Sequence, residues 1–255
     1  IVLVACLKET SSRVNAWQVE RAHGPFSCPA CGEEVVLHKG MVRAHHFAHK
    51  ANSDCQHGAG ETDLHRQAKM QIYQALSCVP ALRCDIEVPL VGVRADVFAR
   101  SVSTKRSYAI EVQISQLTMA QIIERTKRYA KLGVYVLWLF EWKPELLTRQ
   151  YAPSLKERWA HALNFGWVYY WRGGDEVTPV KFAKYMLYRP ESTWYEQGEE
   201  QSAGGFEYAS KRFRTPQAAR KPLCISSDFH GIDRGAWSGG DIVIPACKIL
   251  TARSL

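Results

Sequence analysis

YAIEVQISQ, residues 108–116, is an apolar run of the kind that forms a buried strand, yet it contains two polar side chains, Glu111 and Gln113. Because side chains alternate between the two faces of a strand, these two residues lie on the same face. A buried carboxylate costs several kcal/mol unless a cation or a hydrogen-bond donor pairs with it. The sequence therefore predicts that Glu111 faces a partner supplied by neighbouring elements.

The elements around this strand predict an α/β fold in which helices flank a mixed sheet. Residues 134–142 (VYVLWLFEW) are a nearly uninterrupted apolar run, which is typical of a central or parallel strand. Thr118 is a candidate N-cap and Gly133 a candidate end for the helix that precedes this strand. We expect helices over 61–77, 118–133 and 154–166, and strands over 84–92, 93–101, 107–115, 134–142 and 167–172.

The chain has 255 residues, and its composition divides it into three parts. Residues 1–58 hold cysteines and histidines in short, hairpin-like pieces, and residues 59–188 hold the α/β pattern. Residues 189–255 form a polar extension rich in Gly and Pro. Within this extension we expect a long loop or a partly ordered segment over 189–222 and a closing strand near the end.

Charge and cysteine content restrict the class of protein. Lys and Arg number 33 against 25 acidic residues, and the net charge of +8 is compatible with a polyanion such as DNA without requiring one. The eight cysteines are unevenly spaced and include one C-x-x-C pair, which indicates one metal site rather than a disulfide framework. We therefore expect a cytoplasmic protein. No apolar run approaches the roughly 18 residues that cross a bilayer, so no membrane partner is expected.

The first part of the chain has the pattern of a zinc-ribbon-like β module. The sequence CPACG forms a zinc-knuckle turn, and an H-x-x-H pair follows it across a predicted hairpin. The candidate ligands are Cys28, Cys31, His46 and His49, with Cys55 or His45 able to replace one of the histidines. A redox pair or two unrelated thiols is the alternative. A structural Zn²⁺ would supply the free energy that so small a core lacks.

A second group of polar residues surrounds Glu111. Asp96 lies between apolar neighbours in the preceding strand, VRADVF. We expect Asp96 and Glu111 to share Mg²⁺ or Mn²⁺ through carboxylate oxygens, and Gln113 to contact the attacking water, as a divalent-metal nuclease requires. The alternative is that Asp96 pairs with Arg94 or Arg125 and that Glu111 joins a hydrogen-bond network.

The first helix adds three more candidates for the same site. Glu61, His65 and Lys69 follow each other at four-residue steps, which places them on one polar face. An acid on a helix, an Asp on one strand and Glu-x-Gln on the next together predict a catalytic site for phosphodiester hydrolysis.

The motifs CPACG, HHFAH, ETDLHRQAK, RADV, AIEVQIS and ERTKRYAKLGVYVLWLF occur in an order that resembles the CoiA-like competence proteins, over roughly residues 20–142. This resemblance implies a cysteine/histidine module followed by a restriction-endonuclease-like domain of the PD-(D/E)xK type, and hence a DNA-processing enzyme. By position, Asp96 and Glu111 match the metal-binding acids, Gln113 the usual lysine, and Glu61, His65 and Lys69 the polar residues of the first helix. Glutamine carries no charge, so Lys69, Arg125 or Lys127 would have to supply the charge that a lysine gives.

Several basic residues could contact a phosphate backbone. The candidates are Arg94, Arg125, Lys127, Arg128 and Lys131, and a solvated helix face balanced by Glu124 is the alternative. Residues 207–222 place Tyr208 and Phe213 among five basic residues, a pattern that suits single-stranded bases but also occurs in ordinary loops.

The expected function is that of a Mg²⁺- or Mn²⁺-dependent DNA nuclease, acting as an endonuclease or an exonuclease. The resemblance suggests single-stranded or branched DNA in competence, recombination or defence against foreign DNA, with protein partners from such a system. The alternatives are an accessory DNA-binding protein with a nuclease fold and no cleavage, and a zinc-organised interaction module.

Overall fold

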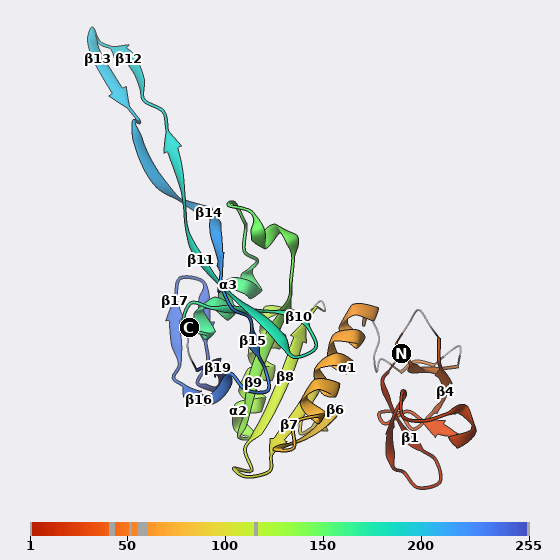
Figure 1. The fold of residues 1–255 in the computed structure, drawn as a ribbon. Helices are drawn as coiled ribbons and strands as arrows, with labels where there is room; N and C mark the ends of the chain where they lie inside the picture. The colour runs from red at the N-terminus through yellow and green to blue at the C-terminus, as the bar shows by residue number, and fades with distance from the viewer. Residues whose placement is uncertain (1, 41–43, 51–52, 56–60, 115–116, 254–255) are drawn as a thin grey trace.

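The computed structural model describes residues 2–40, 44–50, 53–55, 61–114 and 117–253. These residues form a small β module at the N-terminus and a mixed α/β body, from which a long two-stranded ribbon extends (Figure 1). The predicted fold class, a mixed sheet flanked by helices and preceded by a cysteine/histidine module, is confirmed.

The N-terminal module is a five-stranded antiparallel sheet in the order β2-β1-β3-β4-β5. In β4 the buried and exposed positions alternate, so that Val35 and Leu37 pack inward against Phe26 and Phe47. The strands are β1 (Val4–Leu7), β2 (Arg13–Asn15), β3 (Phe26–Ser27), β4 (Glu34–His38) and β5 (His46–His49), and a short 3-10 helix, η1 (Arg21–His23), precedes β3.

The body is a mixed sheet with the main strand order β14-β11-β10-β9-β8-β7-β6. The neighbours β8/β9 and β9/β10 are parallel, and the other pairs along this path are antiparallel. The strands are β6 (Leu82–Leu90), β7 (Val93–Ser101), β8 (Ser107–Gln113), β9 (Val134–Glu141), β10 (Val168–Gly173), β11 (Glu176–Arg189) and β14 (Phe206–Ala218).

Helices cover both faces of this sheet, and neighbouring residues of β9 pack against helices on opposite faces. Val136 packs with Tyr129 of α2 on one face, and Leu137 packs with Ile72 of α1 on the other. The predicted N-cap of α2 is present, because the Thr118 side chain accepts a hydrogen bond from the Gln121 amide, and Thr62 caps α1 in the same way by accepting from the His65 amide. The helices are α1 (Asp63–Ser77), α2 (Met119–Lys131) and α3 (Leu155–Leu163), with a short 3-10 helix, η2 (Pro144–Leu147), before α3.

The C-terminal part differs from the prediction. The prediction of a loop over 189–222 is wrong for most of that range. Instead, β11 and β14 pair antiparallel, and the strands β12 and β13 pair beyond them. The extension also joins the sheet of the body, since β19 pairs in parallel with β9. The remaining strands are β12 (Ser192–Glu196), β13 (Glu199–Ala203), β15 (Leu223–Cys224), β16 (Phe229–Arg234), β17 (Trp237–Gly239), β18 (Ile242–Ile244) and β19 (Cys247–Ala252).

The N-terminal module contacts the edge of the sheet at β6. The guanidinium of Arg13 donates to the carbonyl oxygens of Ile86 (2.8 Å) and Glu87 (3.2 Å), and the amide of Leu3 donates to the Glu87 carboxylate (3.3 Å). The two Arg13 bonds satisfy carbonyl groups that an edge strand would otherwise expose.

Across the described ranges, no helix combines the length and the apolar character needed to pass through a membrane.

Candidate metal centre and candidate nuclease site

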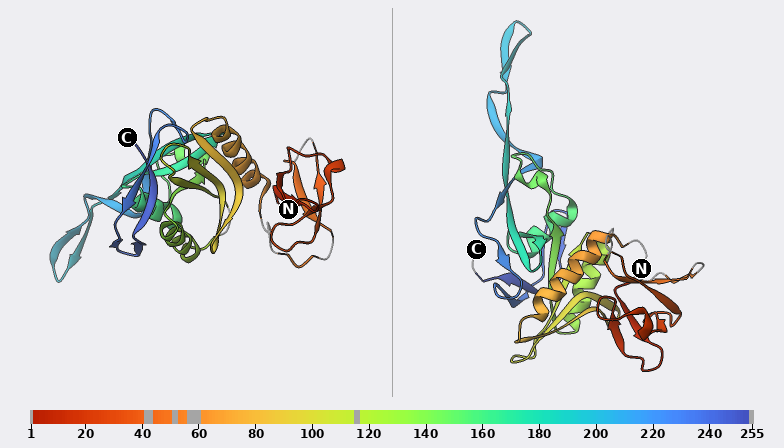
Figure 2. Two further views of the ribbon diagram at one scale, coloured as in Figure 1. Left: turned by 90° about the horizontal axis from the view of Figure 1, so that it is seen from below. Right: turned by 45° about the vertical axis from the view of Figure 1, so that its right-hand side comes forward.

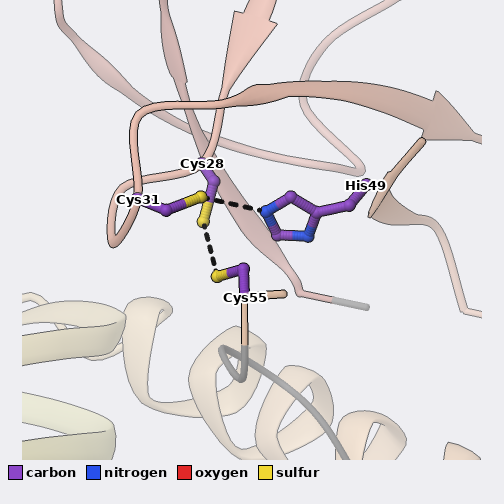
Figure 3. A group of neighbouring side chains, drawn as sticks. All are labelled: Cys28, Cys31, His49 and Cys55. Carbon is purple, nitrogen blue, oxygen red and sulfur yellow. Dashed lines mark hydrogen bonds between the residues drawn. The ribbon is translucent and has the colours of Figure 1, made fainter. Parts of the chain in front are cut away.

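Four side chains of the N-terminal module converge on one point (Figure 3): Cys28, Cys31, His49 and Cys55, whose ligand atoms all lie within 4.8 Å of one another. The Cys31 Sγ lies 3.2 Å from the His49 Nε2, and the Cys28 Sγ lies 4.0 Å from the Cys55 Sγ. Three thiols and one imidazole are a donor set for tetrahedral structural zinc. The residues therefore fit a zinc ion, and a Cys3His cluster could bind it.

The turn that carries Cys28 and Cys31 is shaped for this role. Gly32 has a φ of +76°, a left-handed conformation that glycine adopts without strain. The amide of Ala30 points at the Cys28 Sγ at 3.4 Å, as the backbone of a knuckle does toward a thiolate.

His46 is not a member of this cluster. Its ring stacks on His38 with 5.2 Å between the centroids, and its Nδ1 lies 2.9 Å from the carbonyl oxygen of Ala44. The cause is the strand period of two: residues 46 and 49 are three apart on β5 and therefore point to opposite faces. Cys55 occupies the position that the H-x-x-H spacing had given to His46.

Asp96 lies where β7 and β8 separate, since their pairing ends at Val97 and Ile110. Its Oδ2 accepts a hydrogen bond from the amide of Val112 (3.0 Å) and lies 3.1 Å from the His65 Nε2. Burial alone would raise the pKa of Asp96, but the His65 hydrogen bond and the charges of His65 and Lys69 hold it well below its usual range. Asp96 is therefore an ionised carboxylate at the start of a gap between two strands.

His65 lies between two acids. Its Nδ1 is 3.3 Å from a Glu61 carboxylate oxygen, on the side of the ring opposite Asp96. Burial alone would lower the pKa of His65, but the hydrogen bond to Asp96 and that carboxylate's charge raise it. The imidazolium form is thus favoured, and it fixes the orientation of both acids.

Lys69 is fully buried and is held by two carboxylates. Its Nζ pairs with Glu61 and lies 2.5 Å from the Glu87 Oε1. Burial lowers the pKa of Lys69, and the charges of Glu87 and Glu61 more than offset this and raise it. The ammonium is therefore permanently charged but enclosed, so Lys69 positions Glu61 and does not reach a phosphate.

Glu61 has one oxygen that its neighbours do not use. Its Oε2 is buried and, within the described ranges, has no hydrogen-bond partner, whereas its Oε1 contacts His65 and Lys69. Burial raises the pKa of Glu61. This oxygen is available to a cation or to a water molecule.

Glu111 is buried and faces α2. Its Oε2 lies 2.5 Å from the Nη2 of Arg125, and its Oε1 accepts a hydrogen bond from the Tyr129 hydroxyl. Burial and the charge of Asp96 raise the pKa of Glu111 to about 7. The partner of Glu111 is here a guanidinium rather than a divalent ion, which agrees with the alternative of a hydrogen-bond network.

Asp96 and Glu111 thus bond to side chains of helices that cover opposite faces of the sheet. Asp96 contacts His65 of α1, and Glu111 contacts Arg125 and Tyr129 of α2, although the charge of Asp96 is close enough to raise the pKa of Glu111. To share one ion with Asp96, Glu111 must turn away from Arg125.

Gln113 is buried at the end of β8, two residues beyond Glu111 and on the same face of the strand.

The five predicted DNA contacts fall into two groups. Lys127 and Lys131 are exposed on α2, as a phosphate contact requires. Arg125 bonds to Glu111 and to the carbonyl oxygen of Arg94 (2.7 Å), and Arg128 pairs with Glu124 (3.0 Å) and with the Gly92 carbonyl. Arg94 is only partly exposed on β7.

Two residues of this network were not predicted as part of the site. Glu87, in DIEVP, has the same signal as Glu111, a carboxylate between apolar neighbours in a strand. Tyr129 lies one helical turn after Arg125, which places both on the face of α2 that covers Glu111.

Comparison with known proteins assigns a family to this arrangement. The family model "Competence protein CoiA, N-terminal domain" matches residues 9–58, and "Competence protein CoiA, nuclease-like domain" matches residues 61–162. A competence protein CoiA of Bacillus subtilis (strain 168) is 30% identical over 118 residues, which are 45% of this chain and 31% of that relative. No solved structure matches the chain. With its two domain matches covering more than half of its length, the chain belongs to the CoiA-like competence protein family.

Proposed function

We propose that this protein is a Mg²⁺- or Mn²⁺-dependent DNA nuclease of the competence type. The observation that carries this proposal is the position of Asp96, which lies where β7 and β8 separate, is linked through His65 to Glu61 just before α1, and is close enough to Glu111 of β8 for its charge to raise the pKa of that residue. Oxygen ligands of this kind suit magnesium and manganese. The nuclease-like domain match and the net charge of +8 support DNA as the substrate.

Asp96 and Glu111 would hold the cation, and the Oε2 of Glu61, which has no hydrogen-bond partner among the described residues, would complete its shell directly or through water. When bound, such an ion lowers the pKa of a coordinated water and neutralises charge on the scissile phosphate. Gln113 would orient the attacking water through its amide.

Arg125 supplies the charge that Gln113 lacks. When Glu111 turns toward Asp96, its ion pair with Arg125 is broken, and the guanidinium becomes free to contact phosphate. Lys69 cannot take this role because it is enclosed by Glu61 and Glu87. Arg125→Lys should therefore lower cleavage, since an ammonium lacks the planar fork of donors.

A cleavage assay tests the proposal. Labelled single-stranded, duplex and branched DNA is incubated with the protein and Mg²⁺ or Mn²⁺, using Asp96→Ala and Glu111→Gln as variants. Each change should lower the rate by about 100-fold or more. Glu124→Gln is the matched control, because Glu124 is an exposed acid of α2 that pairs with Arg128 on the helix surface. Cleavage that is equal in all four proteins would contradict this site.

The second candidate is an accessory protein that binds DNA without cleaving it. The engagement of both Glu111 oxygens by Arg125 and Tyr129 favours this function, because it leaves no free ligand on that residue. Salt-dependent DNA binding with no cleavage under either metal would support it over the nuclease.

A further inference from the structure

The ribbon of β11 and β14, capped by β12 and β13, lies outside both regions that match the family. Figures 1 and 2 show it extending well beyond the helices and the body of the sheet. Every residue of β12 is exposed, and so are the first four residues of β14. A two-stranded ribbon with both faces in water gains little from burial, so its side chains are available for binding.

Charge is segregated along this ribbon. The tip, residues 190–203, contains four glutamates and no Lys or Arg. Closer to the body, four cations are exposed, and no ion pair in the described part of the chain engages them. These four are Lys184, Arg189, Lys211 and Arg212. The lower half of the ribbon, residues 184–189 and 206–212, holds these four cations against one exposed acid, Glu207, and therefore attracts a polyanion, whereas the tip repels one.

A wide bulge presents two of these cations. Tyr185 alone on β11 lies opposite residues 210–213 of β14, because the register passes from Lys184↔Arg214 to Met186↔Ala209. The bulge is held in place, since the Arg214 guanidinium donates to the carbonyl oxygens of residues 210 and 213 (both 2.7 Å), and the Phe213 amide donates to the Ser210 Oγ (2.9 Å). Bulges of this kind redirect side chains, here Lys211 and Arg212.

Aromatic rings continue beyond the bulge. Phe206 and Tyr208 are two residues apart on β14 and share a face, and their rings meet edge to face at 6.3 Å. They are 50% and 44% exposed, far more than core aromatics. Their cross-strand partners, Arg189 and Leu187, lie on the same face. Exposed rings beside unpaired cations match the requirements of single-stranded nucleic acid, in which bases stack and phosphates follow the charges.

We propose that the lower half of the ribbon binds single-stranded DNA, through a platform made of Arg189, Phe206, Tyr208, Lys211 and Arg212. The proposal rests on the proposed function only for the choice of DNA as the polymer, since binding does not require cleavage. The bases stack on Phe206 and Tyr208 while the cations contact phosphates, and the acidic tip sets the end of the bound segment. Duplex DNA binds less well, because its bases are already stacked within the helix.

Fluorescence anisotropy with a labelled oligothymidylate tests this platform. The full chain is used without added magnesium or manganese, over a range of salt concentrations. Phe206→Ala/Tyr208→Ala should weaken single-strand binding by about 10-fold or more. Lys211→Ala/Arg212→Ala should weaken it and also reduce the salt slope by about 1.4, as expected for two lost phosphate contacts on a single strand.

Trp194→Ala/Tyr195→Ala is the matched control, because it removes two exposed rings from the acidic tip of the same ribbon. This control should bind as the unchanged chain does. Platform variants that bind normally, or a control that loses as much affinity as they do, would overturn the proposal. The proposal would also be overturned if the platform variants lost as much affinity for duplex DNA as for single-stranded DNA. Because the readout is binding, an absence of cleavage would contradict only the nuclease proposal and leave this one standing.

Discussion

Glu111 is a buried acid of the candidate site whose protonation depends on its burial and on neighbouring charges. Its carboxylate is 2% exposed and lies near Asp96, which is ionised, and near Arg125, which is a cation. Burial and the Asp96 charge prevail, so the pKa of Glu111 rises to about 7. Near neutral pH this residue therefore exchanges between a protonated form and a form that can bind a metal.

Replacing Glu111 by Gln should change how stability depends on pH. The pKa of Glu111 is 4.5 in the unfolded chain and about 7 in the fold, so its contribution is complete below pH 4.5 and is lost as the pH rises through 7. As the pH rises between these two values, the free energy of unfolding of the unchanged protein should fall by about 1–3 kcal/mol relative to that of Glu111→Gln. Urea unfolding at several pH values, without added magnesium or manganese, measures this difference. Parallel pH dependence in the two proteins would show that the pKa is not raised.

Lys69 should be more important for stability than any exposed lysine of the same domain. Lys69→Met would leave Glu61 and Glu87 as buried carboxylates without their shared cation, at a cost of about 3–5 kcal/mol. Lys131→Met on the exposed face of α2 should change stability by less than about 0.5 kcal/mol. Denaturant unfolding compares them, and a loss of similar size in both variants would show that Lys69 is not held as described.

At the level of elements, the sequence was most informative where one face of an element is buried. The capping threonines of α1 and α2 and the apolar run of β9 have local signals, and each element lies where it was predicted. The ribbon has no such signal. Both of its faces meet water, so the alternation of polar and apolar residues that marks a half-buried strand is weak in 189–222.

The zinc ligands show the same dependence on local geometry. Cys28 and Cys31 follow from the knuckle turn and His49 from the H-x-x-H pair, but the same spacing added His46, which points to the opposite face because β5 is a strand. Cys55 comes from a segment whose position depends on the fold of the whole module.

Zinc content should distinguish His46 from Cys55. The purified chain should hold one zinc ion, and His46→Ala should retain it, because His46 contacts His38 and Ala44 instead of the cluster. Cys55→Ser should lose most of it, since a structural site needs all four ligands. Metal analysis after dialysis measures both. Loss of zinc from His46→Ala and retention by Cys55→Ser would restore the ligand set expected from the sequence.

At the level of the whole molecule, the N-terminal module and the candidate site are joined through β6. Arg13 and Leu3 of the module bond to β6 at Ile86 and Glu87, and Glu87 pairs with Lys69. The order of the motifs indicated the family, whose two domain models match residues 9–58 and 61–162. It could not predict this connection or the pairing of Glu111 with Arg125, because both depend on how elements distant in sequence pack together.

Removing zinc should therefore loosen β6. If the metal holds the module together, a chelator should speed amide hydrogen exchange over 82–90, because the Arg13 and Leu3 bonds are lost with the module's fold. The strand β16, which pairs with β19 on another part of the sheet, should keep its exchange rate and serves as the internal control. If amide exchange in β6 is unchanged after zinc loss, the N-terminal module does not stabilise the edge of the body's sheet.

The metal proposed for the nuclease site can be located by anomalous X-ray scattering from crystals grown with Mn²⁺. We expect an anomalous peak about 2.0–2.6 Å from carboxylate oxygens of both Asp96 and Glu111, with Glu111 turned away from Arg125. A map with no peak between these two residues, in which Glu111 still bonds to Arg125 and Tyr129, would contradict the proposed nuclease site.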